Sequence, residues 1–153
     1  MTKHDPDLWF AFIRAHRLMI REIERRFTAA GLPNYAWYDV LWGLESSPDG
    51  SRRMYELADV LAIERYNLTR IIDRLVNEGL VTRARSVEDG RAAYATITSK
   101  GKSLRKEMWG VYQKAVQELF LSQFTSKQVE EVERSLAGAG TAARRSFIGS
   151  DFN

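Results

Sequence analysis

Side chains that suit contact with nucleic acid bases are concentrated in one short stretch of the chain, residues 63–80. Its apolar residues repeat at i, i+3, i+4 and i+7; they are Leu68, Ile71, Ile72 and Leu75. This spacing predicts a helix with one buried face. Polar groups fall on its other face and flanks; they belong to Arg65, Tyr66, Asn67, Thr69, Arg70 and Arg74. Guanidinium, amide and hydroxyl groups hydrogen-bond to base edges and phosphates, so the stretch predicts a DNA-reading helix.

A basic hairpin is predicted directly after this helix. Gly79 suits the left-handed conformation that ends helices, and residues 80–85 then alternate as a strand does. Residues 88–91 are predicted to form a tight turn, and residues 92–97 are interpreted as the returning strand. Three arginines of the hairpin join the predicted DNA contacts: Arg83, Arg85 and Arg91. Asp89 is expected to support the hairpin by orienting the last of these arginines.

The stretch upstream completes a recognisable DNA-binding unit. Residues 54–61 predict a short amphipathic helix, separated by a tight turn from the helix within residues 63–80. Two short helices followed by a basic hairpin constitute a winged helix-turn-helix, in which the second helix enters the major groove of DNA.

The same residues resemble the MarR family of bacterial transcriptional regulators. The similarity is carried by Thr-Arg-Ile-Ile-Asp-Arg-Leu at 69–75, by Asp-Gly-Arg at 89–91 and by Thr-Ser-Lys-Gly at 98–101, and it extends over nearly the whole chain. The resemblance implies a homodimer on a pseudo-palindromic operator in double-stranded DNA. It also implies repression as the default, relieved by a small aromatic or phenolic ligand bound between the dimer helices and the winged unit.

Composition is that of an ordinary globular protein: 153 residues, 44% hydrophobic and 28% charged. The chain has no Cys, which excludes a disulfide framework, a cysteine metal site and a thiol redox sensor. A formal charge of +3 permits nucleic-acid binding. We find neither a signal peptide nor an apolar span long enough for a membrane, so we expect a cytoplasmic protein with no membrane partner. No cofactor or metal is expected.

Further helices flank the winged unit. A long helix is predicted over residues 7–30 and a second over 35–45, capped by Asn34. Later helices are expected to begin at Thr98 and, with a capping-box pattern, at Thr125. The first helix also bears a basic face, interpreted as solvent-exposed with i,i+4 ion pairs: Arg14, Arg17, Arg21 and Arg25.

The predicted fold is mainly α (α+β), a winged helix-turn-helix with long N- and C-terminal dimerisation helices. We expect one domain over residues 1–153, with DNA-binding region 34–97 and helical dimerisation regions 7–30 and 98–149. The flanking helices carry more apolar surface than the small winged unit can cover, which favours a homodimer. Such a dimer would present two recognition helices to major grooves about 34–36 Å apart. The alternative is a monomeric helical cap.

Aromatic residues on the first two helices raise a ligand hypothesis. A small aromatic acid needs a flat apolar slot and a cationic or hydrogen-bonding end. The residues expected to supply these are Trp9, His16, Arg17, Tyr38 and Trp42. The alternative is that the aromatic residues, and His16 among its apolar neighbours, simply pack in the core.

The sequence also bears on two other classes of function. Enzymatic activity is not expected, because the chain has two His, no Cys and no recognisable catalytic spacing. A winged helix used only for protein contacts, without a small-molecule effector, is the alternative to a DNA-binding regulator. Such a module would not need arginines on both the recognition helix and the hairpin tip.

Overall fold

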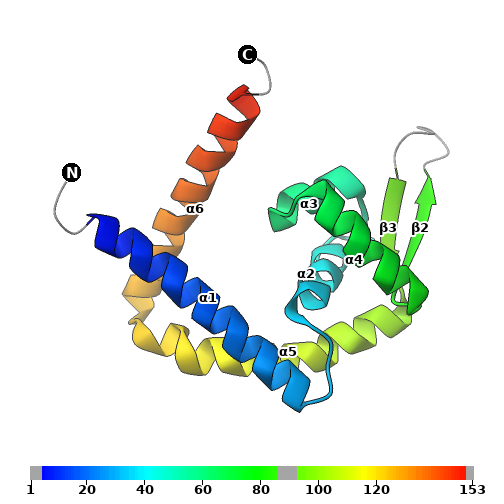
Figure 1. Ribbon diagram of the computed structural model, residues 1–153, viewed down its shortest axis with the longest axis horizontal. Coiled ribbons are helices and arrows are strands. Elements are labelled where there is room, and N and C mark those ends of the chain that lie inside the picture. The colour runs from blue at the N-terminus through cyan, green and yellow to red at the C-terminus, as the bar shows by residue number, and fades with distance from the viewer. Residues whose placement is uncertain (1–4, 86–92, 151–153) are drawn as a thin grey trace. The chain divides into compact units, whose positions relative to one another are not determined.

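The computed structural model describes residues 5–85 and 93–150, which form two compact units, Met1–Lys114 and Ala115–Asn153 (Figure 1). Whether residues 1–153 act as one domain, as expected from the sequence, stays a prediction. The described elements follow one another as α1 (Asp5–Ala29), α2 (Tyr35–Glu45), β1 (Ser51–Arg53), α3 (Met54–Leu61), α4 (Arg65–Asn77), β2 (Val81–Arg85), β3 (Ala93–Ile97), α5 (Ser99–Leu119), a 3-10 turn η1 (Leu121–Gln123) and α6 (Ser126–Ser150).

Local signals in the sequence place the helices of the winged unit. The bounds of α2 and α3 coincide with the predicted ranges 35–45 and 54–61. The Asn34 side chain caps α2 by accepting a hydrogen bond from the Trp37 N–H at 3.3 Å. Gly79 follows α4 with a φ of +72°, the left-handed conformation expected of it.

The strands form one antiparallel sheet with the order β1-β3-β2. In its register Tyr94 of β3 lies between Arg53 of β1 and Ala84 of β2. β2 and β3 are the strands of the predicted hairpin; β2 begins one residue later than expected, and β3 is described from Ala93. β1 was not predicted, because three residues are too few to show a periodicity.

The core of the first unit lies among α2, α3, α4 and the sheet. Its residues include Val40, Leu41, Leu44, Leu57, Leu68, Ile72, Leu75, Val81 and Ala95, each at most 1% exposed. Ile71 is only partly buried but packs against this cluster. The apolar spacing of residues 68–75 therefore describes the buried face of α4 correctly.

In the second unit, α6 begins at a reciprocal cap. The Thr125 N–H donates to the Gln128 side chain at 2.9 Å, and the Gln128 N–H donates to Thr125 Oγ1 at 3.2 Å. This is the capping box expected from the sequence. Within residues 5–85 and 93–150, no helix is long and apolar enough to cross a membrane.

Candidate nucleic-acid interface

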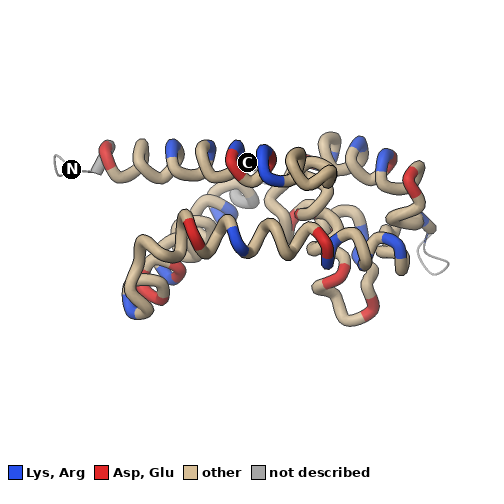
Figure 2. The backbone as a smooth tube through the Cα atoms, turned by 90° about the horizontal axis from the view of Figure 1, so that it is seen from below, with Lys and Arg blue, Asp and Glu red and all other residues tan. Residues whose placement is uncertain are grey.

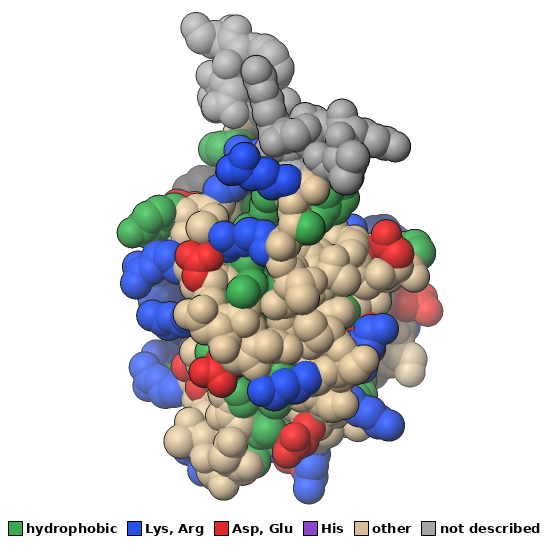
Figure 3. All heavy atoms as spheres, turned by 90° about the vertical axis from the view of Figure 1, so that its right-hand side faces the viewer, with side chains coloured by type: hydrophobic (Ala, Val, Ile, Leu, Met, Phe, Trp, Pro, Cys, Tyr) green, Lys and Arg blue, Asp and Glu red, His purple; other side chains and the backbone are tan. Residues whose placement is uncertain are grey.

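Helix α4 exposes every side chain predicted on it to contact DNA. Leu68, Ile72 and Leu75 are fully buried beneath it. The exposed side chains are those of Arg65, Tyr66, Asn67, Thr69, Arg70 and Arg74. Figure 3, which views the molecule from the right-hand side of Figure 1, shows several Lys and Arg side chains gathered along one edge. The helix thus presents a basic, hydrogen-bonding surface on a rigid apolar base.

Two of these side chains already have contacts within α4. The Arg70 guanidinium lies 5.7 Å from the centre of the Tyr66 ring, a cation–π distance that helps to hold the arginine against this ring. Thr69 Oγ1 donates to the Arg65 carbonyl oxygen at 2.9 Å. Its hydroxyl hydrogen is therefore engaged, and Thr69 offers DNA an acceptor rather than a donor.

The hairpin arginines have different surroundings. Arg83 Nη2 donates to Asp73 Oδ1 of α4 at 2.6 Å, so this arginine is held against the helix. Arg85 is exposed at the last position of β2. Arg91 and Asp89 lie outside the described residues, and their predicted roles stay predictions.

The junction of α4, the hairpin and α5 is fastened by hydrogen bonds. The Leu80 N–H donates to the Leu75 carbonyl at 2.9 Å, and the Thr98 N–H donates to the Leu80 carbonyl at 3.1 Å. Thr98 Oγ1 donates to the Gly79 carbonyl at 2.8 Å, and Lys100 Nζ donates to the Glu78 carbonyl, also at 2.8 Å. These bonds fix the end of α4 relative to the start of α5.

Sequence reasoning missed the arginines of β1. Arg52 Nε donates to the Gly43 carbonyl at 2.6 Å, and Arg53 donates to the hydroxyls of Tyr94 and Tyr55. The sequence did contain a signal for them: Arg52 and Arg53 are consecutive and directly precede a predicted helix, a pattern that indicates a basic position at the start of α3.

The residues proposed for a ligand lie in different environments. Tyr38 is 3% exposed and stacks on Tyr112 of α5, with ring centres 4.5 Å apart. Trp42 and Trp9 are 45% and 65% exposed. His16 is also exposed, so in this chain it is not a core histidine.

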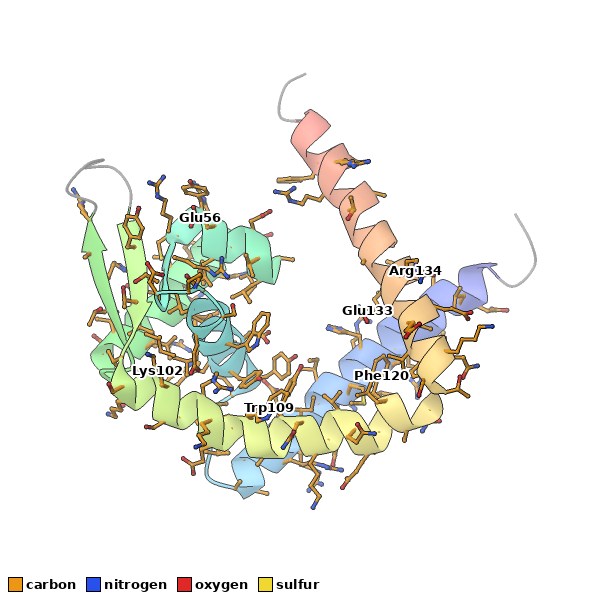
Figure 4. All side chains as sticks on the ribbon, turned by 180° about the vertical axis from the view of Figure 1, so that it is seen from behind. Glu56, Lys102, Trp109, Phe120, Glu133 and Arg134 are labelled. Atoms are coloured by element: carbon orange, nitrogen blue, oxygen red, sulfur yellow. The ribbon has the colours of Figure 1, made fainter. Side chains whose placement is uncertain are left out.

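An aromatic cluster joins α2 to α5. Tyr112 also contacts Tyr35 and Trp109, both with ring centres 5.8 Å away. Figure 4 labels Trp109 on α5 beside α2. The sequence pointed to aromatic residues on the first two helices, but it did not predict that Tyr112 of α5 would join α2 to α5.

Burial perturbs the titrating groups of α2. Desolvation raises the pKa of Asp39 to about 6. The pKa of Tyr38 rises to about 12, mainly from burial and then from Tyr112, and the pKa of Tyr35 rises for the same first reason and because Asp39 lies near. Both tyrosines are therefore neutral hydrogen-bonding groups at physiological pH.

The basic face of α1 is only partly paired. Arg25 and Arg26 hydrogen-bond to Glu22 and lower the pKa of that carboxyl to about 2, as expected of i,i+3 and i,i+4 pairs. Figure 2 shows basic residues recurring along α1. Arg17 lines a shallow hollow of about 290 Å³ with Phe10, Ile13, Arg14, Leu18 and Arg21.

The sheet order, the two short helices and the exposed basic helix define a winged helix-turn-helix protein. Residues 33–92 match the model described as MarR family. The HTH-type transcriptional regulator PrsX of Escherichia coli is 34% identical over 119 residues, 71% of this chain and 71% of that protein. The chain belongs to the MarR family of transcriptional regulators.

Two further relatives agree with this assignment. The HTH-type transcriptional repressor IacR of Pseudomonas putida is 31% identical over 134 residues, 86% of this chain and 75% of that protein. The crystal structure of Sco3205 from Streptomyces coelicolor, a MarR family regulator in complex with DNA, matches with a TM-score of 0.86 at 23% identity, covering 94% of this chain and 93% of that one. The predicted winged-helix fold is confirmed.

Proposed function

We propose that this MarR-family regulator is a homodimer that binds a pseudo-palindromic operator and represses transcription until a small aromatic ligand releases it. The observation that carries DNA binding is the exposed basic face of α4 above a fully buried apolar face. Arg85, exposed on the neighbouring strand, extends the same positive surface toward the hairpin tip. In this arrangement α4 enters the major groove and the wing enters the adjacent minor groove.

The side chains of α4 divide between base and backbone contacts. Arg70, supported by the Tyr66 ring, is placed to read a guanine edge, which accepts two hydrogen bonds from one guanidinium. Asn67 and Thr69 supply shorter polar groups to neighbouring bases. Arg65 and Arg74 stand on the flanks and are assigned to phosphates.

Support for a dimer comes from large apolar side chains that are exposed to solvent in a single copy of the chain. On α1, Leu8, Trp9 and Phe10 are 74%, 65% and 65% exposed. On α6, Leu136 and Phe147 are 41% and 69% exposed. A second copy that covers these side chains would remove a large apolar surface from water. Analytical ultracentrifugation should give a dimer, and Trp9→Ser with Phe10→Ser should shift it toward monomer.

DNA binding is tested by selecting duplexes from a random pool with the purified protein. We expect a two-fold-related sequence whose half-sites lie about one helical turn apart. The double variant Arg70→Ala with Arg74→Ala should lose this binding. Lys106→Ala with Lys114→Ala, which removes the same charge from exposed positions of α5, should keep it. Failure to bind any duplex at low salt would overturn the proposal.

The ligand part of the proposal rests on the aromatic cluster of α2 and α5 and on the basic side chains of α1. Tyr112, which is stacked on the buried Tyr38, offers a flat aromatic ring, and Arg17 offers a guanidinium for a carboxylate. Trp9, Trp42 and His16 are the other residues assigned to this site.

Calorimetry with salicylate-like acids tests this assignment on the free dimer and on its operator complex. Linkage requires that a ligand that weakens operator binding about tenfold also binds the complex about tenfold more weakly, roughly 1.4 kcal/mol in each direction. His16→Ala and Trp42→Ala should reduce affinity in the free state. Equal affinity in both states would remove the release mechanism, and no binding by any such acid would remove the ligand class.

A further inference from the structure

Arg53, at the end of β1, is held in place by two tyrosines. Its Nε donates to the Tyr94 hydroxyl at 2.8 Å, and its Nη1 donates to the Tyr55 hydroxyl at 3.3 Å. The guanidinium carbon also lies 5.5 Å from the centre of the Tyr94 ring. These contacts come from β3 and α3, so they fix the direction of the arginine against two separate elements.

The charge of Arg53 is not neutralised by these contacts. A phenol hydroxyl accepts a hydrogen bond but carries no charge near neutral pH. Among the residues that the structure describes, no carboxylate forms an ion pair with Arg53. Its Nη2 makes no hydrogen bond within that same set. Arg53 is therefore a preorganised full positive charge with one nitrogen still available to donate.

Arg53 lies on the strand that pairs with β3 of the wing. In the sheet register Arg53 pairs with Tyr94, one step from the pair Arg85 and Ala93 that borders residues 86–92. Figure 4 shows Glu56, in the first turn of α3, beside this end of the strands, whereas Lys102 of α5 lies at their other end. In a helix-turn-helix the first helix crosses the phosphate backbone. Arg53 directly precedes that helix.

The surface around Arg53 is open and holds two carboxylates that are already engaged. Arg53 lines a shallow hollow of about 580 Å³ together with Ser47, Ser51 and Tyr94. Asp49 accepts hydrogen bonds from Ser47 Oγ and the Ser51 N–H. Glu56 accepts one from the Arg53 N–H at 3.3 Å. Both acids are thus committed to capping the turn and α3.

We propose that Arg53 is a phosphate contact: its guanidinium, positioned by Tyr94 and Tyr55, binds the DNA backbone between the groove entered by α4 and the groove entered by the wing. This inference rests on the proposed function. It adds β1, an element that sequence reasoning missed, to the interface. Tyr94 and Tyr55 are positioning residues, and they act on DNA only through Arg53.

The test is how the affinity for the selected operator depends on salt concentration. Fluorescence anisotropy measures this affinity. Arg53→Ala should reduce the slope of log Kobs against log salt by about 1 for each subunit, and it should weaken all duplex sequences by the same factor. Tyr94→Phe keeps the ring but removes the hydroxyl. It should weaken binding less than Arg53→Ala and leave the slope nearer to that of the wild type.

Two variants separate this effect from charge and from folding. Lys102→Ala removes one positive charge at the opposite end of the strands and should leave the slope unchanged. Arg53→Lys keeps the positive charge but loses the paired hydrogen bonds of the guanidinium to Tyr94 and Tyr55. This variant should have most of the salt slope that Arg53→Ala loses. Thermal unfolding of each variant checks that the fold is intact.

The outcomes distinguish the inference from the proposal beneath it. If the wild type binds its operator and folded Arg53→Ala binds with an unchanged slope, the phosphate contact is overturned while the regulator remains. If Arg53→Ala changes preference at one base pair only, Arg53 reads a base and the inference is likewise overturned. If the wild type binds no duplex, the proposed function fails first.

Discussion

Arg83 on β2 and Asp73 on α4 are joined by a hydrogen-bonded ion pair, Nη2 to Oδ1, at 2.6 Å. The pair connects the proposed recognition helix to the wing across a sequence separation of 10 residues. Its side chains are 35% and 56% exposed, so solvent screening limits its contribution to folding stability to less than about 1 kcal/mol. Its larger effect is on charge, because it places a carboxylate in the basic surface of α4.

Removing that carboxylate should strengthen non-specific DNA binding. Asp73→Asn deletes a negative charge near the phosphates and frees Arg83, so we expect random duplex at low salt to bind about 2- to 5-fold more tightly. Fluorescence anisotropy at two salt concentrations measures this change. Glu107→Gln makes the same charge change on an exposed position of α5. An equal gain from Glu107→Gln would show that only net charge matters.

Arg70→Ala should alter specificity as well as affinity. Loss of a bidentate contact to guanine should cost about 1–3 kcal/mol and relax preference at one position in each half-site. Repeating the duplex selection with the variant measures the change. If all sequences instead weaken equally, Arg70 contacts phosphate. Lys106→Ala is the matched control, since it removes one positive charge from an exposed position of α5 and should leave the preference unchanged.

Arg91→Ala should weaken binding most on operators with A·T-rich flanks. A narrow A·T-rich minor groove concentrates negative potential, which attracts an inserted arginine. Affinities for two operators that differ only in their flanks give the comparison. Losses of the same size on G·C-rich and A·T-rich flanks would contradict a minor-groove position for Arg91.

Asp39→Asn should stabilise the protein at neutral pH. Because burial raises the pKa of Asp39 from 3.8 to about 6, the folded state binds more protons than the unfolded state between about pH 4 and 6. The free energy of unfolding therefore falls as pH rises through this window. Replacing Asp39 by a neutral residue should raise it at pH 7.5 by on the order of 1–2 kcal/mol and change it little near pH 4.

Urea unfolding at the two pH values checks this prediction. Asp49→Ala is the control of opposite sign, because hydrogen bonds from Ser47 and Ser51 lower the pKa of Asp49. That variant should lose stability at neutral pH, and its deficit should shrink as the pH falls through the titration of Asp49. An Asp39→Asn difference that does not depend on pH would contradict the assigned shift.

Two glycines of α5 should respond in opposite directions to alanine. A Cβ on Gly101 would overlap the Leu80 carbonyl oxygen and the Ile97 side chain, so Gly101→Ala should cost more than about 2 kcal/mol of unfolding free energy. A Cβ on Gly110 would meet nothing within 4 Å, so Gly110→Ala should raise the free energy of unfolding by about 0.5–1 kcal/mol. Denaturant unfolding of both variants tests the pair, and effects of equal sign would contradict it.

The helices could be predicted because their signals are local. Apolar residues three and four apart define the buried face of α4, and single caps such as Asn34 fix where helices begin. The exposed face of α4 follows from the same geometry. These parts of the fold and of the interface needed no knowledge of distant contacts.

What could not be predicted depends on pairs distant in sequence. β1 exists because it pairs with β3, and Arg53 meets Tyr94 across 41 positions. Tyr38 stacks on Tyr112 from a different helix. The sequence shows that arginines and aromatic rings are present. Which of them meet is decided by how the helices and strands pack.

The junction between α4 and the wing also constrains how the length of the chain can vary. Only Glu78, Gly79 and Leu80 separate α4 from β2, and Thr98 alone separates β3 from α5. One residue inserted at 78–80 would turn every side chain of β2 to the opposite face and carry Val81 out of the core. Descendants of this gene should therefore diversify their operators by exchanging side chains on a constant spacing, while insertions and deletions accumulate elsewhere.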